Sequence, residues 1–129
     1  MIYLADTHSL IWFLTEDENL SNEARGVFLK AEKGEVIIVI PTIVLAEMLF
    51  ICEKKGFKNE FSQFIEKIKN SQNFVFYNLD LDVIMMCEGL AKIREMHDRI
   101  IVATAIGLGA MVITKDEEIK ITNYIKTIW

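Results

Sequence analysis

The sequence contains few of the residues that form disulfide frameworks, structural zinc sites and flexible linkers. Its 129 residues include one proline, six glycines, two cysteines and two histidines. Two cysteines are too few for a disulfide framework, and without a C-x-x-C pair a structural zinc site is not expected. No tract rich in serine or glutamine interrupts the chain, which argues against disorder. We therefore expect a single folded domain over residues 1–129.

The sequence also lacks membrane-length apolar runs and an excess of positive charge. The apolar run from Ile100 to Thr114 is shorter than the roughly 20 residues needed to cross a bilayer. Asp6 interrupts the apolar start, where a signal peptide would lie. These features predict a soluble, cytoplasmic protein without a membrane segment. The net charge of −5 argues against a broad nucleic-acid-binding face, but it allows a small site whose carboxylates are neutralised by cations.

What the sequence does contain is a regular alternation of apolar β-branched runs and helical patterns. Strands are predicted over residues 1–5, 36–40, 73–79 and 110–114, with an edge strand over 124–129. Helices are predicted over residues 7–14, 21–34, 42–55, 58–71, 80–96 and 98–107. This alternation predicts an α/β fold, with a parallel sheet covered by helices on both faces.

Four acidic residues are placed unusually in this pattern. Asp6 directly follows the first strand, Asp116 comes two residues after the fourth, and Asp98 starts the helix that leads into the fourth. Because ligands of open α/β sheets bind outside the carboxyl ends of the strands, these three side chains are expected to meet. Glu47 is the only charged residue in the run TIVLAEMLFIC, where an unpaired carboxylate is costly to bury.

Each of these residues also has a purely structural interpretation. Asp6 and Asp98 could cap the helices that begin at the next residue. Asp116 could be an ordinary turn residue, and Glu47 could pair with Arg99 or a lysine. The convergence of carboxylates from four separated segments favours a functional site instead.

Such a cluster needs compensation, because like charges raise one another's pKa. Divalent cations supply it. Mg²⁺ and Mn²⁺ prefer oxygen ligands, and one or two such ions can activate a water and stabilise both oxygens in a phosphodiester displacement. The acidic residues therefore indicate metal-assisted hydrolysis at this edge of the sheet.

Four segments of the sequence together resemble a known family. LADTHSLIWFL near the start, PTIVLAEM in the middle, HDRIIVATAIGLGAMVITKD near the end and a short terminal strand look like a PIN domain. Their order and spacing are those of the VapC-like toxin branch, and the resemblance covers essentially the whole chain. It implies a three-layer α/β/α fold with a central parallel sheet of strand order 3-2-1-4-5.

The resemblance also implies a site and an activity. The family's acidic ligands for Mg²⁺ or Mn²⁺ correspond to Asp6, Glu47, Asp98 and Asp116. The family's hydroxyl residue, which orients a carboxylate or water, corresponds to Thr114, and Glu118 could share the task of Asp116. The implied activity is metal-dependent endoribonuclease cleavage, which leaves a 5′-phosphate and a 3′-hydroxyl. The implied partners are RNA, a small antitoxin whose C-terminal segment occupies the site, and a second copy of the chain.

Other residues carry weaker predictions. Arg99 and Lys115 are candidate phosphate contacts by position, although each could equally be a solvated surface residue. His8 could approach a phosphate, but it is rather expected to pack or hydrogen-bond at the helix start. Trp12 is expected in the core or at a dimer surface rather than as a platform for bases.

Two kinds of alternative function compete with the nuclease. A phosphatase on a related fold is disfavoured, because Asp6-Thr7-His8 lacks the second aspartate of a D-x-D motif. A phospho-acceptor domain is disfavoured because the first strand supplies only Asp6 and the third leads into Asn78, with Asp80 slightly beyond. The other alternative is a catalytically inactive PIN-like module that binds RNA or a protein partner. The four acidic residues argue against it, because a binding module has no need of so costly a cluster.

Overall fold

The centre of the fold is a five-stranded sheet in which all neighbouring strands are parallel. The computed structural model describes residues 1–57 and 59–129. The strands are β1 (Ile2–Ala5), β2 (Ile37–Pro41), β3 (Phe74–Tyr77), β4 (Met111–Ile113) and β5 (Thr127–Ile128). They lie in the order β3-β2-β1-β4-β5. This confirms the predicted order 3-2-1-4-5.

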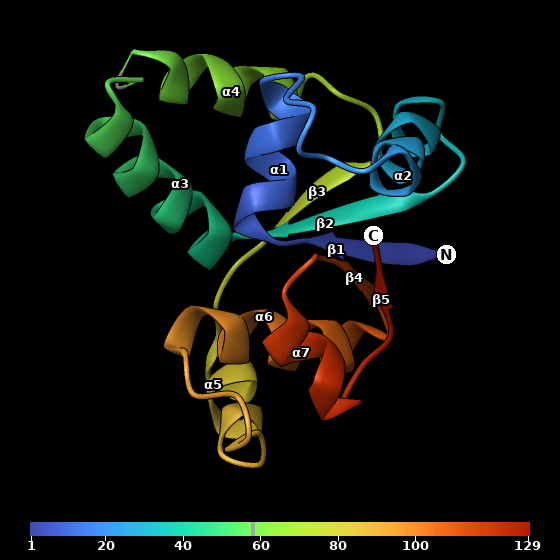
Figure 1. Cartoon of the computed structure of the whole chain (residues 1–129), viewed down its shortest axis with the longest axis vertical. Helices are drawn as coiled ribbons and strands as arrows, with labels where there is room; N and C mark the ends of the chain where they lie inside the picture. Colours follow the sequence, from blue (N-terminus) through green and yellow to red (C-terminus); the bar gives the residue numbers. More distant parts are fainter. Residues whose placement is uncertain (58) are drawn as a thin grey trace.

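Helices cover both faces of the sheet, which confirms the predicted α/β/α layers (Figure 1). One face carries α1 (Thr7–Leu14), α2 (Asn22–Glu32), α3 (Thr42–Lys55) and α4 (Glu60–Lys69). The other carries α5 (Leu81–Cys87), α6 (Met96–Leu108) and α7 (Glu117–Thr122). Within residues 1–57 and 59–129, no helix has both the length and the apolar character needed to span a membrane.

Local signals in the sequence account for most of the helix ends. Ser21 caps α2 by accepting the backbone N–H of Ala24 at 3.0 Å. Gly56 ends α3 with a positive φ of 81°, a conformation that glycine adopts without steric cost. The fourth helix, predicted from residue 58, begins at Glu60, and Lys58 itself lies outside the described residues.

The core fixes the strands whose carboxyl ends carry the acidic residues. The buried ends of β1 and β4 are apolar: Leu4, Ala5, Val112 and Ile113 have no exposed surface. Above them, Phe13 of α1 stacks on Phe28 of α2 with ring centroids 4.4 Å apart. Burial of each large side chain contributes about 1.5–3 kcal/mol, so the edge of the sheet is held rigidly beneath the helices.

The segment between β3 and β4 corrects the sequence prediction. Instead of one helix from Asp80 to about Met96, α5 ends at Cys87, and turns follow before α6 begins at Met96. Leu90 and Ile93 lie in these turns, yet they are buried in the same apolar cluster as Val83. Their helix-like spacing therefore reflects burial and not helical structure. As a consequence, α6 begins two residues earlier than predicted.

Candidate active site

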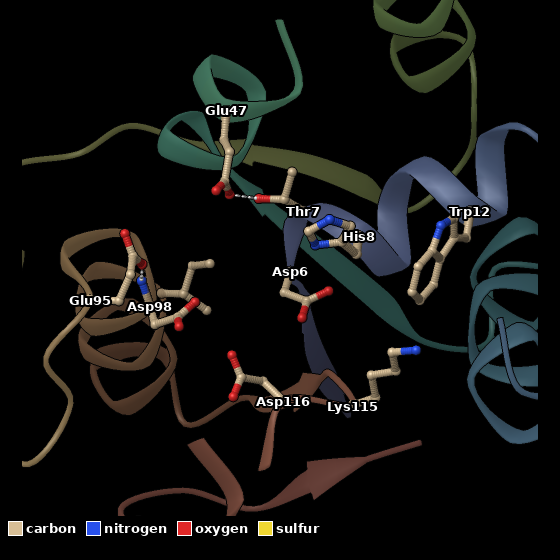
Figure 2. Close-up of a pocket in the computed structure, with 10 residues that line it drawn as sticks. Asp6, Thr7, His8, Trp12, Glu47, Glu95, Asp98, Lys115 and Asp116 are labelled. Carbon is tan, nitrogen blue, oxygen red and sulfur yellow. Dashed lines mark hydrogen bonds between the residues drawn. The ribbon is translucent and has the colours of Figure 1, made fainter. Parts of the chain in front are cut away.

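A cavity of about 540 Å³ lies at the carboxyl edge of the sheet (Figure 2). Asp6 reaches it from the end of β1, Asp116 from the segment after β4, Asp98 from α6 and Glu47 from α3. The structure thus brings all four predicted acidic residues to one cavity. Its lining residues are Asp6, Thr7, His8, Trp12, Glu47, Glu95, Asp98, Ile101, Lys115 and Asp116.

Asp6 is held at the junction of two strands and a helix. Its backbone N–H donates to the carbonyl of Ile113 in β4 at 3.3 Å. Its Oδ1 accepts the backbone N–H of Ser9 at 2.9 Å, so the helix-cap interpretation is correct. Burial raises the pKa of Asp6, while hydrogen bonds from Thr114 and Ser9 act in the opposite direction. Asp6 therefore caps α1 and also presents its carboxylate to the cavity (Figure 2).

Asp98 is not a helix cap, which corrects the structural interpretation given above. The cap of α6 is Glu95, whose Oε2 accepts the backbone N–H of Asp98 at 2.7 Å. Glu95 also accepts a 2.6 Å hydrogen bond from Nδ1 of His97 when that nitrogen is protonated. With the cap supplied by Glu95, the side chain of Asp98 is free to face the cavity (Figure 2).

Glu47 pairs with a hydroxyl, and within residues 1–57 and 59–129 no ion pair joins it to Arg99 or to a lysine. The hydroxyl of Thr7 donates to Oε1 of Glu47, which links α1 to α3. Thr7 is buried, so this contact fixes the one carboxylate in the apolar run TIVLAEMLFIC of α3. The cost of placing Glu47 within this run is thereby reduced.

Thr114 and Asp116 form a tight turn after β4. Thr114 is fully buried, and its Oγ1 accepts the backbone N–H of Asp116 at 3.0 Å. Asp116 in turn caps α7, because its Oδ1 accepts the backbone N–H of Glu118 at 2.8 Å. Asp116 lines the cavity, whereas Glu118 is exposed. The geometry therefore favours Asp116 over Glu118 as the fourth acidic residue of the site.

The two candidate phosphate contacts lie in different places. Lys115 lines the acidic cavity. Arg99 lies instead on a separate cavity with Ile84 and Met96, and its Nε donates to the carbonyl of Ile93 at 2.8 Å. The position next to Asp98 in sequence suggested a shared site, but successive residues of a helix point about 100° apart.

Glu95 and Trp12 are lining residues that the sequence prediction missed. Glu95 is an uncommon helix cap, since Ser, Thr, Asp and Asn are preferred there. Trp12 packs against the core, as expected, but it also lines the cavity. The one available signal was its spacing of four residues from His8, which places both on one face of α1.

The acidic residues influence one another electrostatically. Burial, together with the negative charges of Asp116, Glu95 and Asp6, raises the pKa of Asp98 to about 7. Burial also works to raise the pKa of Glu95, but hydrogen bonds from Asp98 and His97 together lower it. The cluster therefore holds more negative charge than its surroundings stabilise.

The donor chemistry of the cavity fits Mg²⁺ or Mn²⁺. Its carboxylates offer only oxygen, the ligand that these ions prefer, and a cation would offset the repulsion around Asp98. In the described part of the chain, no three His, Cys, Asp or Glu side chains are placed closely enough to hold an ion as they stand. Ion binding would therefore require the carboxylates to turn further into the cavity.

Comparison with known proteins assigns the family. The model of the PIN domain family matches residues 3–123, so the chain belongs to the PIN domain family. No curated protein matches the sequence.

Solved structures share the fold over nearly their whole length. VapBC2 from Rickettsia felis, bound to a DNA fragment from its promoter, contains a chain with 17% identity and a TM-score of 0.78, over 99% of this chain and 98% of that one. DNA-bound VapBC from Salmonella typhimurium gives 19% identity and a TM-score of 0.73, over 99% and 97%. VapBC-1 from nontypeable Haemophilus influenzae gives 19% identity and a TM-score of 0.63, over 99% of this chain and 97% of that one.

Proposed function

We propose that this chain is a metal-dependent endoribonuclease that hydrolyses RNA phosphodiester bonds, acting as one domain over residues 1–129. PIN domains are generally nucleases, and the family assignment supports this reaction class. The observation that carries the proposal is the convergence of Asp6, Glu47, Asp98 and Asp116 on one cavity. Helix capping does not account for all four, because only Asp6 and Asp116 of this set cap helices.

In this proposal Asp6, Asp98 and Asp116 hold Mg²⁺ or Mn²⁺, and Glu47 completes the acidic set. When bound, the ion supplies a more acidic water and neutralises charge that develops on the phosphate. Thr114 orients Asp116 and Asp6 through its hydroxyl, and Thr7 orients Glu47. Lys115 is the proposed phosphate contact. The placement of Arg99 on another cavity makes it the weaker candidate for that role.

The family also suggests partners. We propose a small antitoxin protein and a second copy of the chain as partners, and the cytoplasm as the location of the protein. The solved structures named above are of VapBC proteins, and this likeness supports a toxin of that kind.

The decisive experiment is cleavage of end-labelled structured RNA by the purified protein in Mn²⁺, Mg²⁺ or EDTA. Asp98→Asn is run beside it, with Asp82→Asn as a matched control, because Asp82 is exposed on α5. We expect metal-dependent cutting that leaves 5′-phosphate ends, is lost in Asp98→Asn and is retained in Asp82→Asn. Cutting that survives EDTA and Asp98→Asn would refute the assigned site. A biological effect that survives Asp98→Asn would favour the inactive binding module.

A further inference from the structure

One wall of the acidic cavity is aromatic and basic, and the proposed hydrolysis uses none of its aromatic groups. The indole of Trp12 lies 5.5 Å from the ring of His8, centroid to centroid, and 5.9 Å from the ring of Trp129, which meets it edge-on. Nζ of Lys115 lies 4.8 Å from the centroid of the Trp12 ring. Figure 2 shows Trp12 and Lys115 on the side of the cavity away from Glu95 and Asp98.

The residues of this wall lie close in sequence to two of the acidic residues. Asp6 caps α1, and Trp12 lies on that same helix, six residues further on. At 1.5 Å per residue this is a rise of about 9 Å along α1. On the other side, Lys115 directly precedes Asp116. A base held at Trp12 would therefore belong to a nucleotide close to the phosphate held at the acidic residues.

The ring of Trp12 is held in place by packing, but part of it stays accessible for stacking. It is half-buried and packs against the apolar core, so little side-chain freedom remains to be lost on binding. Lys115 is exposed, and an exposed cation–π contact is weak. A nucleobase can thus displace the ammonium group from the ring, and the displaced cation is then available to a backbone phosphate.

We infer that Trp12 is a stacking platform for an unpaired nucleobase of the substrate and that Lys115 binds the adjoining phosphate. The inference rests on the proposed ribonuclease function and adds the residue that would hold a base beside the acidic cluster. Aromatic side chains can stack only on bases that are free of a duplex, whereas paired RNA is recognised by shape and by its 2′-hydroxyls. Among the described lining residues, Lys115 is the one permanent cation, so little else at the cavity attracts a rigid duplex backbone.

The test measures RNA binding separately from cleavage. The protein carries Asp98→Asn, to spare the RNA, and Trp129→Phe, which makes Trp12 the one remaining tryptophan of the two in the chain. A single-stranded RNA that the unmodified protein cuts is titrated in, and tryptophan fluorescence is followed. The same RNA is then made with one abasic residue at each position in turn, and also annealed into a duplex. We expect quenching by the single strand, and a loss of affinity of about 5- to 150-fold at one abasic position near the cut.

Variants of the wall separate stacking from charge. Trp12→Ala should bind intact and abasic RNA with equal affinity. Trp12→Phe should keep part of the difference in affinity between the two RNAs. This second variant also controls for a folding defect in Trp12→Ala. Lys115→Ala should weaken intact and abasic RNA by the same factor and lower the salt dependence by about one phosphate contact. The controls are Phe50→Ala and Lys30→Ala, which remove an exposed aromatic ring and an exposed cation outside the cavity lining.

The outcomes distinguish the inference from the proposed function. The inference alone is overturned if the RNA is cut but an abasic residue at any position leaves its affinity unchanged, and if Trp12→Phe leaves that affinity unchanged as well. Equal cutting of the single strand and the duplex overturns it as well. RNA that is neither cut by the unmodified protein nor bound by the Asp98→Asn form overturns both.

Discussion

The pKa of Asp98 predicts that the carboxylate most central to the proposed chemistry destabilises the metal-free fold. The folded protein raises this pKa from its ordinary value of 3.8 to about 7. The folded state therefore binds the proton more tightly than the unfolded state between these two pH values. The stabilisation that the Asp98 proton contributes is fully present below pH 3.8 and is lost as the pH rises towards 7. Asp98→Asn mimics the neutral acid, so we expect it to be more stable than the unmodified protein at pH 8.

The size of the effect follows from the same two pKa values. Each pKa unit corresponds to about 1.4 kcal/mol, which sets a ceiling of about 4 kcal/mol for the gain in the free energy of unfolding. The side chain is half-exposed and shares its charge change with Asp116, so solvent and relaxation reduce the gain. We expect about 1–2 kcal/mol at pH 8, falling towards zero near pH 4.

Urea unfolding in EDTA at pH 4, 6 and 8 measures this difference directly. The comparison of Asp98→Asn with the unmodified protein cancels the titration of most other groups, and Asp82→Asn at an exposed site should change stability by less than about 0.5 kcal/mol. A gain that is the same at all three pH values would refute the electrostatic explanation. A loss of stability at pH 8 would show that the ionised Asp98 is stabilised by contacts that the structure does not contain.

Three further predictions concern the same cavity. Mn²⁺ at 100 times its dissociation constant should raise the free energy of unfolding by about 2.7 kcal/mol at pH 8, and calorimetry should show no such rise for Asp98→Asn. Thr7→Val removes the hydroxyl that donates to Glu47, so the cleavage rate should fall about 10-fold or more while Thr7→Ser keeps most of it; equal rates would contradict the orienting role. The hydrogen bond and charge of Glu95 raise the pKa of His97, so in Glu95→Gln that pKa should fall towards 6.5 in an NMR titration of the ring protons, and an unchanged value would exclude the contact in solution.

The central strands were predictable because their continuous apolar runs are typical of burial on both faces of a sheet. The run VIIVI predicted a strand over residues 36–40, and β2 spans Ile37–Pro41. The region from Asp80 to Met96 was not predictable in the same way. Leu90 and Ile93 have helical spacing from Val83, and hydrophobic spacing reports which side chains are buried but not the backbone conformation between them. The short helix α7 was missed because the acidic run after Lys115 carries no extended apolar face.

The acidic residues of the site were predictable, and their supports were not. Asp6 and Asp116 could be placed from the strand ends alone, because the carboxyl ends of parallel strands share one edge. The roles of Glu95 and Thr7 depend on where a helix begins and on which helix packs beside it. Those are properties of tertiary packing, and no local pattern around either residue specifies them.

The cavity is complete only after β1, near the start of the chain, has paired with β4, near its end. Tyr3 lies opposite Met111 in this pair, and the backbone of Asp6 is tied to Ile113. Contacts between such distant parts of a sequence form slowly, because the intervening chain must first be organised. A growing or partly folded chain therefore presents Asp6 and Glu47 without Asp116 beside them. The proposed hydrolysis can begin only when this three-residue strand has paired with β1, and a break in the chain between α3 and α6 leaves half of the acidic set on each fragment.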